Sequence, residues 1–262
     1  MDTAGSKLKH QVYRQWRIAA TGLAFALFGI GGPIIALAIT LTQPLPISPI
    51  RRRVWTRRCI NGAFWCYIRI MRGLGLLSFE TRHIERLAAP GQLVLANHPS
   101  LLDVVFVASL IPEANCVVKG ALFRNPFTRG PVTAAGYIAN DDPNLLSKCR
   151  SALEQGETLI VFPEGTRSQP GEPLQFLRGA ANIALASSDQ VRPVKVTCEP
   201  ATLLKNQQWY QVPDRRPHFL IDAQPAIDIA EFQNASEYQS KNARRLCRFL
   251  EDYYNKLLGL ER

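Results

Sequence analysis

A long uncharged segment near the N-terminus constrains this chain more than any other feature. Residues 18–42 carry no charged side chain, and about 20 apolar residues suffice for a helix to cross the hydrocarbon layer of a bilayer. The segment Gly31-Gly32-Pro33 lies near the centre of this run, where proline removes a backbone donor and glycine weakens a helix. The run therefore predicts a membrane anchor, formed either by one spanning helix or by a re-entrant hairpin.

Basic residues flank this segment. The chain carries 31 Lys and Arg against 21 Asp and Glu, which gives a formal net charge of +10. Seven arginines follow the run with no acidic residue among them, and without these seven the charge of +10 would fall to +3: Arg51, Arg52, Arg53, Arg57, Arg58, Arg69 and Arg72. Positive flanks favour the cytoplasmic side of a membrane and attract anionic headgroups. We expect an anionic membrane surface as a partner, on the cytoplasmic face of a bacterial-type inner membrane, and no nucleic acid, because no nucleic-acid motif accompanies the charge.

The segment 57–72 has the periodicity of an amphipathic helix. Its apolar residues recur three and four positions apart, on one helical face: Ile60, Phe64, Tyr67, Ile68 and Met71. Such a helix can lie in the membrane interface or pack its apolar face on a protein core, and both alternatives are open. Residues 1–79 are thus predicted to form the membrane anchor and the basic amphipathic helix.

The remaining residues, 80–262, have the length of one ordinary domain. Six apolar runs are predicted strands, at 92–96, 115–118, 136–139, 158–162, 191–197 and 218–221. Helices are expected to begin at Ser100, Asn144, Arg178 and Ser240. Several of the runs lack polar alternation, as strands buried on both faces do. The predicted fold class is α/β, a mostly parallel mixed sheet covered by helices, with chemistry at the carboxyl ends of the strands.

Composition excludes several other classes of protein. The contents of 17 Gly and 18 Pro argue against a collagen-like or disordered chain. The six cysteines include no C-x-x-C pair and have no histidine at metal-ligand spacing, so they are expected to be reduced thiols without a metal.

The first strand end with reactive groups lies at residues 93–103. An apolar run ends at Asn97-His98, Pro99 can open a helix, and Asp103 follows five residues after the histidine. The two side chains can meet only if His98 lies outside the helix and turns back. A carboxylate that accepts from Nδ1–H would leave Nε2 free to take a proton from an alcohol. The structural alternative is a local cap without a catalytic role.

The second such strand end lies at residues 159–168. It places Glu164, Gly165 and Arg167 directly after an apolar run. A glycine turn beside a guanidinium lets backbone N–H groups and the arginine approach a phosphate. The structural alternative is a tight turn closed by an ion pair between Glu164 and Arg167.

Together these segments resemble a known family. The runs Asn97-His-Pro-Ser-Leu-Leu-Asp103 and Phe162-Pro-Glu-Gly-Thr-Arg-Ser168 resemble the first and third signature blocks of the glycerophospholipid acyltransferases, whose best-known members are the 1-acylglycerol-3-phosphate acyltransferases. Lys119, Leu122, Pro126 and Gly130 resemble the second block, and Arg192-Pro-Val194 the fourth. The resemblance covers roughly residues 92–200, with all four blocks in order.

The resemblance implies a glycerol-3-phosphate-acyltransferase-like domain and a reaction. His98 would act as general base on the acceptor hydroxyl, oriented by Asp103, and the acyl donor would be acyl-CoA or acyl-acyl-carrier protein. The acceptor would be a lysophospholipid, above all 1-acylglycerol-3-phosphate, which gives phosphatidic acid. The residues expected to bind substrate are Lys119, Glu164, Gly165, Thr166, Arg167 and Arg178. No metal or cofactor is implied, because the thioester is already activated.

One departure from the family pattern keeps alternatives open. Many relatives carry an arginine after the second block, where this chain reads Gly136-Tyr-Ile-Ala-Asn-Asp-Asp142. Another lipid or a secondary-metabolite alcohol is therefore an alternative acceptor. A thioester hydrolase, for which no G-x-S-x-G elbow is present, and a noncatalytic lipid-binding protein are the alternatives from other classes.

Overall fold

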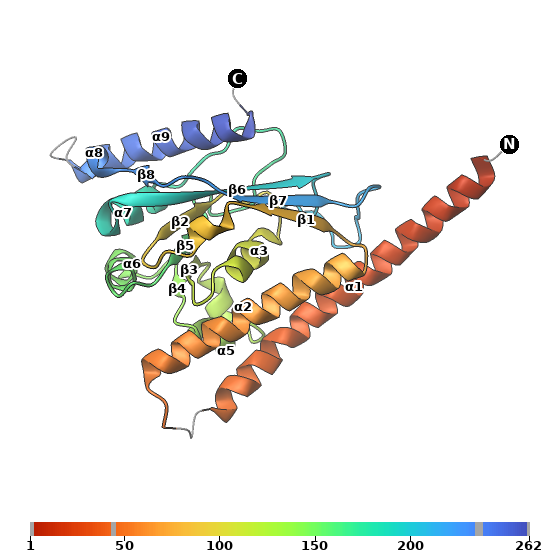
Figure 1. Ribbon diagram of the computed structural model, residues 1–262, viewed down its shortest axis with the longest axis horizontal. Helices are drawn as coiled ribbons and strands as arrows, with labels where there is room; N and C mark the ends of the chain where they lie inside the picture. The colour runs from red at the N-terminus through yellow and green to blue at the C-terminus, as the bar shows by residue number, and fades with distance from the viewer. Residues whose placement is uncertain (1–2, 43–45, 234–237, 261–262) are drawn as a thin grey trace.

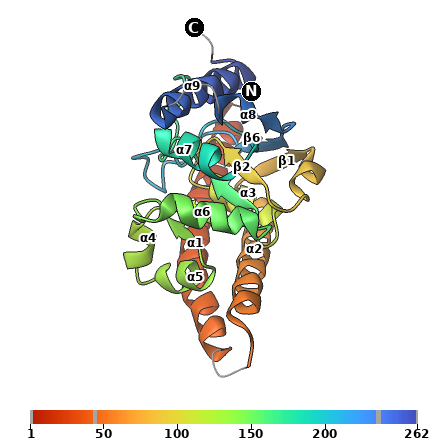
Figure 2. The ribbon, with the colours of Figure 1, turned by 90° about the vertical axis from the view of Figure 1, so that its left-hand side faces the viewer.

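Two long helices precede the α/β domain in the computed structural model, which describes residues 3–42, 46–233 and 238–260. Helix α1 (Thr3–Leu41) and helix α2 (Pro49–Gly73) lie side by side and extend beyond the sheet (Figures 1 and 2). Residues 11–41 of α1 are long and apolar enough to cross a membrane, judged by length and composition alone. Most large apolar side chains of this stretch are exposed, as a membrane-anchoring helix requires.

Of the two alternatives for residues 18–42, the structure has one continuous helix and not a re-entrant hairpin. Helix α1 continues through Pro33, and one of its central glycines, Gly32, serves packing instead of a turn. A Cβ on Gly32 would lie 2.3 Å from the Phe127 carbonyl oxygen, and one on Gly130 would lie 2.9 Å from the Cβ of Ala36. The small residues therefore let α1 approach the segment that leads into α5 (Arg129–Ala134).

Helix α2 packs its apolar face on the domain core. Ile60, Ile68 and Met71 are buried, and Asn61 donates from Nδ2 to the Ala108 carbonyl at 2.8 Å. Arg57, predicted among the headgroup-binding arginines, is only 2% exposed and lies 3.0 Å from the Glu157 carboxylate. For this arginine the prediction was wrong, because a buried ion pair fixes α2 to the domain.

The sheet is mostly parallel, in the order β1-β7-β6-β2-β5-β3-β4, with β8 paired to β6. Its strands are β1 (Ser78–Arg82), β2 (Leu93–Ala96), β3 (Asn115–Val118), β4 (Ile138–Ala139), β5 (Leu159–Val161), β6 (Gln190–Glu199), β7 (His218–Ala223) and β8 (Ile227–Asp228). Among the strands of the described residues, only β6 forms antiparallel pairs, with β7 and β8. All six predicted strands are present, and the predicted α/β class is confirmed. The predicted domain boundary, between residues 79 and 80, falls inside β1.

Helices cover both faces of the sheet (Figure 1). Helices α1, α2 and α3 (Asp103–Leu110) lie on one face, over Val94 and Ala96. Helices α6 (Leu145–Glu154), α7 (Arg178–Ser187) and α9 (Gln239–Leu258) lie on the other, over Leu93 and Leu95. Successive residues of β2 thus enter two separate cores, as a strand buried on both faces does. The short helices are η1 (Ile84–Leu87), α4 (Ala121–Arg124), α5 and α8 (Ala230–Gln233).

Side chains bridge β2 and β6 where the site begins. The Tyr254 hydroxyl donates to the Leu95 carbonyl at 2.6 Å and accepts from the Val194 N–H at 3.2 Å. Directly after the end of β2, Asn97 donates from Nδ2 to the Val196 carbonyl at 2.8 Å and accepts from the Val196 N–H through Oδ1 at 2.7 Å. These contacts satisfy buried backbone groups between the two strands.

We expect Tyr254→Phe to destabilise the protein. Loss of the hydroxyl leaves the Leu95 carbonyl and the Val194 N–H unpaired in the core, which costs about 1–3 kcal/mol. Denaturant unfolding in detergent measures this change. Tyr253→Phe is the matched control, because no hydrogen bond joins its hydroxyl to the described residues. Equal stability of the two variants would contradict the bridging role.

Candidate active site

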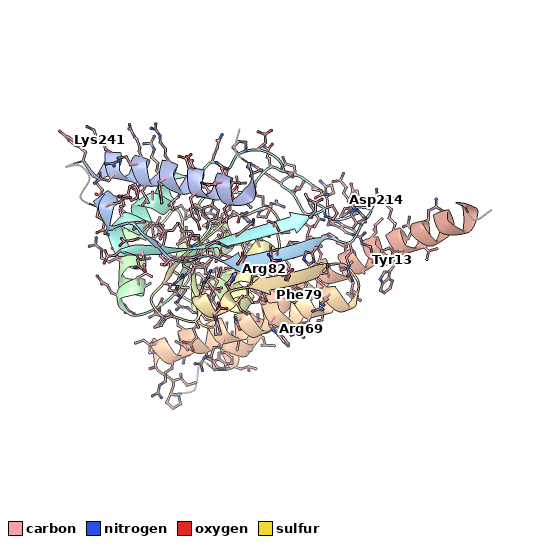
Figure 3. The ribbon with its side chains drawn as sticks, turned by 45° about the horizontal axis from the view of Figure 1, so that its top comes forward. Tyr13, Arg69, Phe79, Arg82, Asp214 and Lys241 are labelled. Carbon is pink, nitrogen blue, oxygen red and sulfur yellow. The ribbon has the colours of Figure 1, made fainter. Side chains whose placement is uncertain are left out.

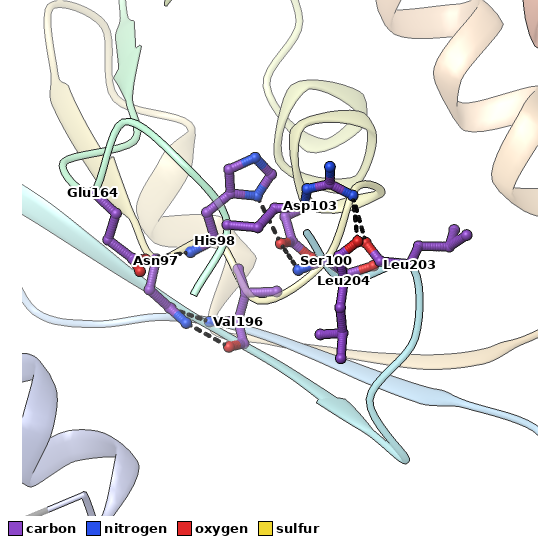
Figure 4. A network of polar contacts seen from close by, with 9 residues as sticks. Asn97, His98, Ser100, Asp103, Glu164, Val196, Leu203 and Leu204 are labelled. Atoms are coloured by element: carbon purple, nitrogen blue, oxygen red, sulfur yellow. Dashed lines mark hydrogen bonds and ion pairs between the residues drawn. The ribbon is translucent and has the colours of Figure 1, made fainter. Parts of the chain in front are cut away.

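The turn after β2 brings His98 and Asp103 together (Figure 4). His98 Nδ1 lies 2.9 Å from Asp103 Oδ2, which also accepts from the Ser100 N–H at 2.5 Å. Helix α3 begins at Asp103, three residues later than expected, because the intervening turn returns the imidazole to the carboxylate. The side chain of Asp103 is fully buried, whereas that of His98 is 16% exposed. An ionised Asp103 accepts from Nδ1–H and leaves Nε2 free for a reacting group.

Burial raises the pKa of Asp103 to about 6, although His98, the Ser100 N–H and the charge of Arg167 all lower it. Its second oxygen, Oδ1, has no hydrogen-bond partner among the described residues. The His98 ring also packs against the Phe162 ring, with centroids 4.8 Å apart. The carboxylate and the aromatic ring together fix the orientation of the imidazole.

The loop after β5 is fastened to the same turn. Glu164, 7% exposed, accepts from the His98 N–H through Oε1 at 2.8 Å, and the Ser168 N–H donates to the His98 carbonyl at 2.8 Å. Burial raises the pKa of Glu164, whereas hydrogen bonding by Ser168 and by the His98 backbone lowers it. Gly165 has a φ of +64°, and a Cβ there would lie 2.5 Å from the Leu177 side chain. The turn therefore requires glycine.

Arg167 does not pair with Glu164. Its Nη1 donates to the carbonyls of Leu203 and Leu204, at 2.8 and 2.9 Å, so the ion pair considered from the sequence is absent from this turn. The Leu203 carbonyl also accepts from the Leu101 N–H at 3.3 Å. One backbone oxygen thus joins the loops that follow β2, β5 and β6, at the centre of the sheet.

A polar cleft of about 890 Å³ opens beside these loops. It is lined by Glu164, Thr166, Arg167, Ser168, Gln169, Glu172, Pro173, Leu174, Gln175, Lys205, Asp252, Asn255 and Leu260. Its walls are the loop after β5, the end of α9 and the segment after β6. Among the described residues, no group of three or more His, Cys, Asp or Glu side chains could hold a metal ion.

The structure gathers part of the set of residues expected from the sequence. Glu164, Thr166 and Arg167 line the cleft, and Gly165 shapes its loop. Lys119, exposed after β3, and Arg178, exposed at the start of α7, do not line it.

Sequence reasoning missed Lys205 and the bridging side chains of Asn97 and Tyr254. Asn97 belongs to the first signature block, and helical periodicity predicts burial for Tyr254. Lys205 follows no pattern that predicts its place.

Comparison with known proteins agrees with the fold and the motifs. A family profile described as Acyltransferase matches residues 78–197. The chain is 34% identical over 168 residues to a 1-acyl-sn-glycerol-3-phosphate acyltransferase of Helicobacter pylori, covering 61% of this chain and 68% of that protein. It is 22% identical to the enzyme of the same name from Borreliella burgdorferi, covering 74% of this chain and 75% of that protein.

A solved structure has the same fold. It is the 1-acyl-sn-glycerophosphate acyltransferase PlsC of Thermotoga maritima, with a TM-score of 0.65 and 15% identity, covering 95% of this chain and 97% of that one. The similarity extends over the N-terminal helices as well as the α/β domain.

We predict a pH-dependent stability difference between the wild type and Asp103→Asn. The folded carboxyl has a pKa of about 6 and the unfolded one 3.8, so the folded chain binds more protons between these values. The stability of the wild type relative to the variant should therefore fall by about 2 kcal/mol as pH rises from about 4 to about 7. Denaturant titrations of both proteins in detergent measure this. A difference that is constant or grows with pH would contradict the raised pKa.

Proposed function

Because this chain belongs to the glycerophospholipid acyltransferase family and is therefore an O-acyltransferase, we propose that it acylates the hydroxyl of 1-acylglycerol-3-phosphate to give phosphatidic acid. The observation that carries the proposal is the 2.9 Å contact between His98 Nδ1 and the buried Asp103 carboxylate. The proposed donor is an acyl thioester, acyl-CoA or acyl-acyl-carrier protein. The related proteins named for this reaction support the choice of acceptor.

The proposed mechanism uses the free nitrogen of His98. Nε2 takes the proton of the acceptor hydroxyl while its oxygen attacks the thioester carbonyl. Asp103 holds the ring and stabilises the imidazolium that forms. The tetrahedral intermediate then expels the thiolate, which takes the proton back from His98. The thioester supplies the activation, so the proposed reaction uses no metal or bound cofactor.

The cleft is the proposed site for the glycerol phosphate of the acceptor. Lys205 and Arg167 supply positive charge, and Thr166 supplies a hydroxyl group on the same wall. One nitrogen of Arg167 donates to two carbonyls, whereas the Lys205 side chain is exposed. The cleft reaches Glu164, whose carboxylate accepts from the His98 N–H, although neither His98 nor Asp103 lines the cleft itself.

The proposed location is the cytoplasmic face of the membrane, reached through α1 and α2. Side chains Leu23, Ile30, Ile34 and Leu37 are exposed along α1. On α2 the Arg69 guanidinium lies 4.2 Å from the centre of the exposed Trp65 ring, a pairing suited to the lipid headgroup region.

Substitution His98→Ala should lower acyl transfer by about 10²- to 10⁴-fold, because it removes the general base. The assay supplies one labelled acyl thioester to a panel of lysophospholipids and simple alcohols. His83→Ala is the matched control, since His83 also contacts a carboxylate, that of Asp222 at 2.8 Å, but at an exposed site. The control should retain full activity. Full turnover by the His98 variant would refute the mechanism, and transfer to neutral alcohols alone would refute the acceptor.

Lys205→Ala should raise the KM for 1-acylglycerol-3-phosphate about tenfold or more, because a charge-assisted contact with phosphate is lost. The turnover number should change little, since Lys205 does not contact the reacting atoms in this proposal. Lys256→Ala, exposed on α9 but not lining the cleft, is the control. Unchanged KM in the Lys205 variant would place the phosphate elsewhere.

A further inference from the structure

The outer face of α9 is strongly basic. Lys241, Arg244, Arg245 and Arg248 are exposed and recur three and four residues apart, on one side of the helix. The sequence has no acidic residue between positions 238 and 250. Figure 3 shows Lys241 projecting from α9 away from the sheet. These four residues are called the α9 basic face below.

In the described part of the chain the α9 basic face makes no ion pair, and the nearest acidic residue exposed on the helix is Asp252, four residues after Arg248. The ion pairs there involve none of its four side chains, although the Lys241 ammonium lies 4.9 Å from the centre of the Tyr238 ring. Tyr238 and Phe249 are themselves exposed next to the face, at 62% and 37%. Arginine and aromatic side chains together are typical of protein interfaces.

The α9 basic face is directed away from the side of the protein that carries the membrane-anchoring helices. Helix α9 covers the face of the sheet opposite to α1 and α2, with the sheet between them (Figure 1). When the apolar side of α1 is in the bilayer, the α9 basic face looks into the aqueous phase. A soluble acidic partner therefore fits it better than anionic lipid does.

The same helix leads to the proposed active site. Asp252 and Asn255, further along α9, line the cleft. From Arg248 to Asn255 the helix rises about 10 Å, at 1.5 Å per residue. A partner bound on the α9 basic face would thus stand next to the cleft, and one of its lining residues, Glu164, accepts from the His98 N–H.

We propose that the α9 basic face docks an acyl carrier protein with an acidic surface, which delivers the acyl thioester. This inference rests on the proposed function. Four cations spread over two helical turns match a protein surface, whereas the phosphates of free CoA would engage a smaller site. Charge complementarity of this kind mainly accelerates association, by roughly 10- to 10³-fold.

The test compares two donors on the full-length protein in detergent. Arg245→Glu/Arg248→Glu reverses two charges of the face. Arg215→Glu/Arg216→Glu, at an exposed pair between β6 and β7, makes the same change of charge elsewhere. With palmitoyl-acyl-carrier protein, kcat/KM should fall about tenfold or more in the α9 variant only. With palmitoyl-CoA, kcat/KM should stay at the wild-type value in both variants.

Three results would overturn the docking proposal. The first is an equal loss of kcat/KM with both donors, and the second is no loss with the carrier protein. The third is loss of binding of the α9 variant to anionic phosphatidylglycerol vesicles with no change in carrier binding, which would make this face a membrane contact.

Direct binding of the holo-carrier protein separates this proposal from the proposed function. If the wild type binds carrier through the α9 basic face but transfers no acyl group, the docking stands and the function fails. If the wild type acylates from CoA but does not bind carrier, the function stands and the docking fails.

Discussion

Burial of one carboxyl group, that of Asp103, organises the centre of this molecule. Removing a carboxylate from water is unfavourable, and the pKa raised to about 6 records that cost. The cost is offset by the His98 ring and the Ser100 N–H, which both bond the same oxygen. The two contacts shape the turn after β2 and orient the imidazole. Loop geometry and the proposed proton transfer therefore depend on one interaction, and a variant of Asp103 changes both.

The three central loops are held as one unit by backbone contacts. Arg167 was expected from the sequence to bind phosphate. In the structure its Nη1 donates to the carbonyls of Leu203 and Leu204. Loss of its guanidinium would move the segment that carries Lys205, so it would affect the cleft even if Arg167 never touched a substrate. A charged side chain near a proposed ligand site can thus hold loops together instead of binding the ligand. Substitution of Lys205 therefore tests phosphate binding more directly than substitution of Arg167.

The sequence predicted those parts of the fold that are buried on both faces. Strands β2 and β5 appear as unbroken apolar runs, because each residue enters one of two cores. Strands β1 and β8 were missed, since β1 is half exposed and mixes polar with apolar residues and β8 has only two residues. The choice between a helix and a hairpin at Gly32-Pro33 stayed open in the sequence, and in the structure the helix continues there while Gly32 meets Phe127, a partner far along the chain. Local sequence patterns do not contain contacts between distant parts of the chain. For the same reason the sequence did not predict that Lys205 lies at the cleft.

The net charge of the chain does not reveal how charged side chains are distributed over its surface. Without the seven arginines near α1 the formal charge of +10 would be +3, which suggests an almost neutral domain. Yet four basic side chains stand on one side of α9, while Glu251 on the same helix faces inward and accepts from the Phe176 N–H. Asp252 is exposed on the same helix, four residues after Arg248, and the acidic residues other than these two lie outside α9. Residues three and four apart lie on the same side of a helix. The four basic residues of α9 therefore form one strongly basic face, opposite the membrane-anchoring helices, although the net charge of the domain is small.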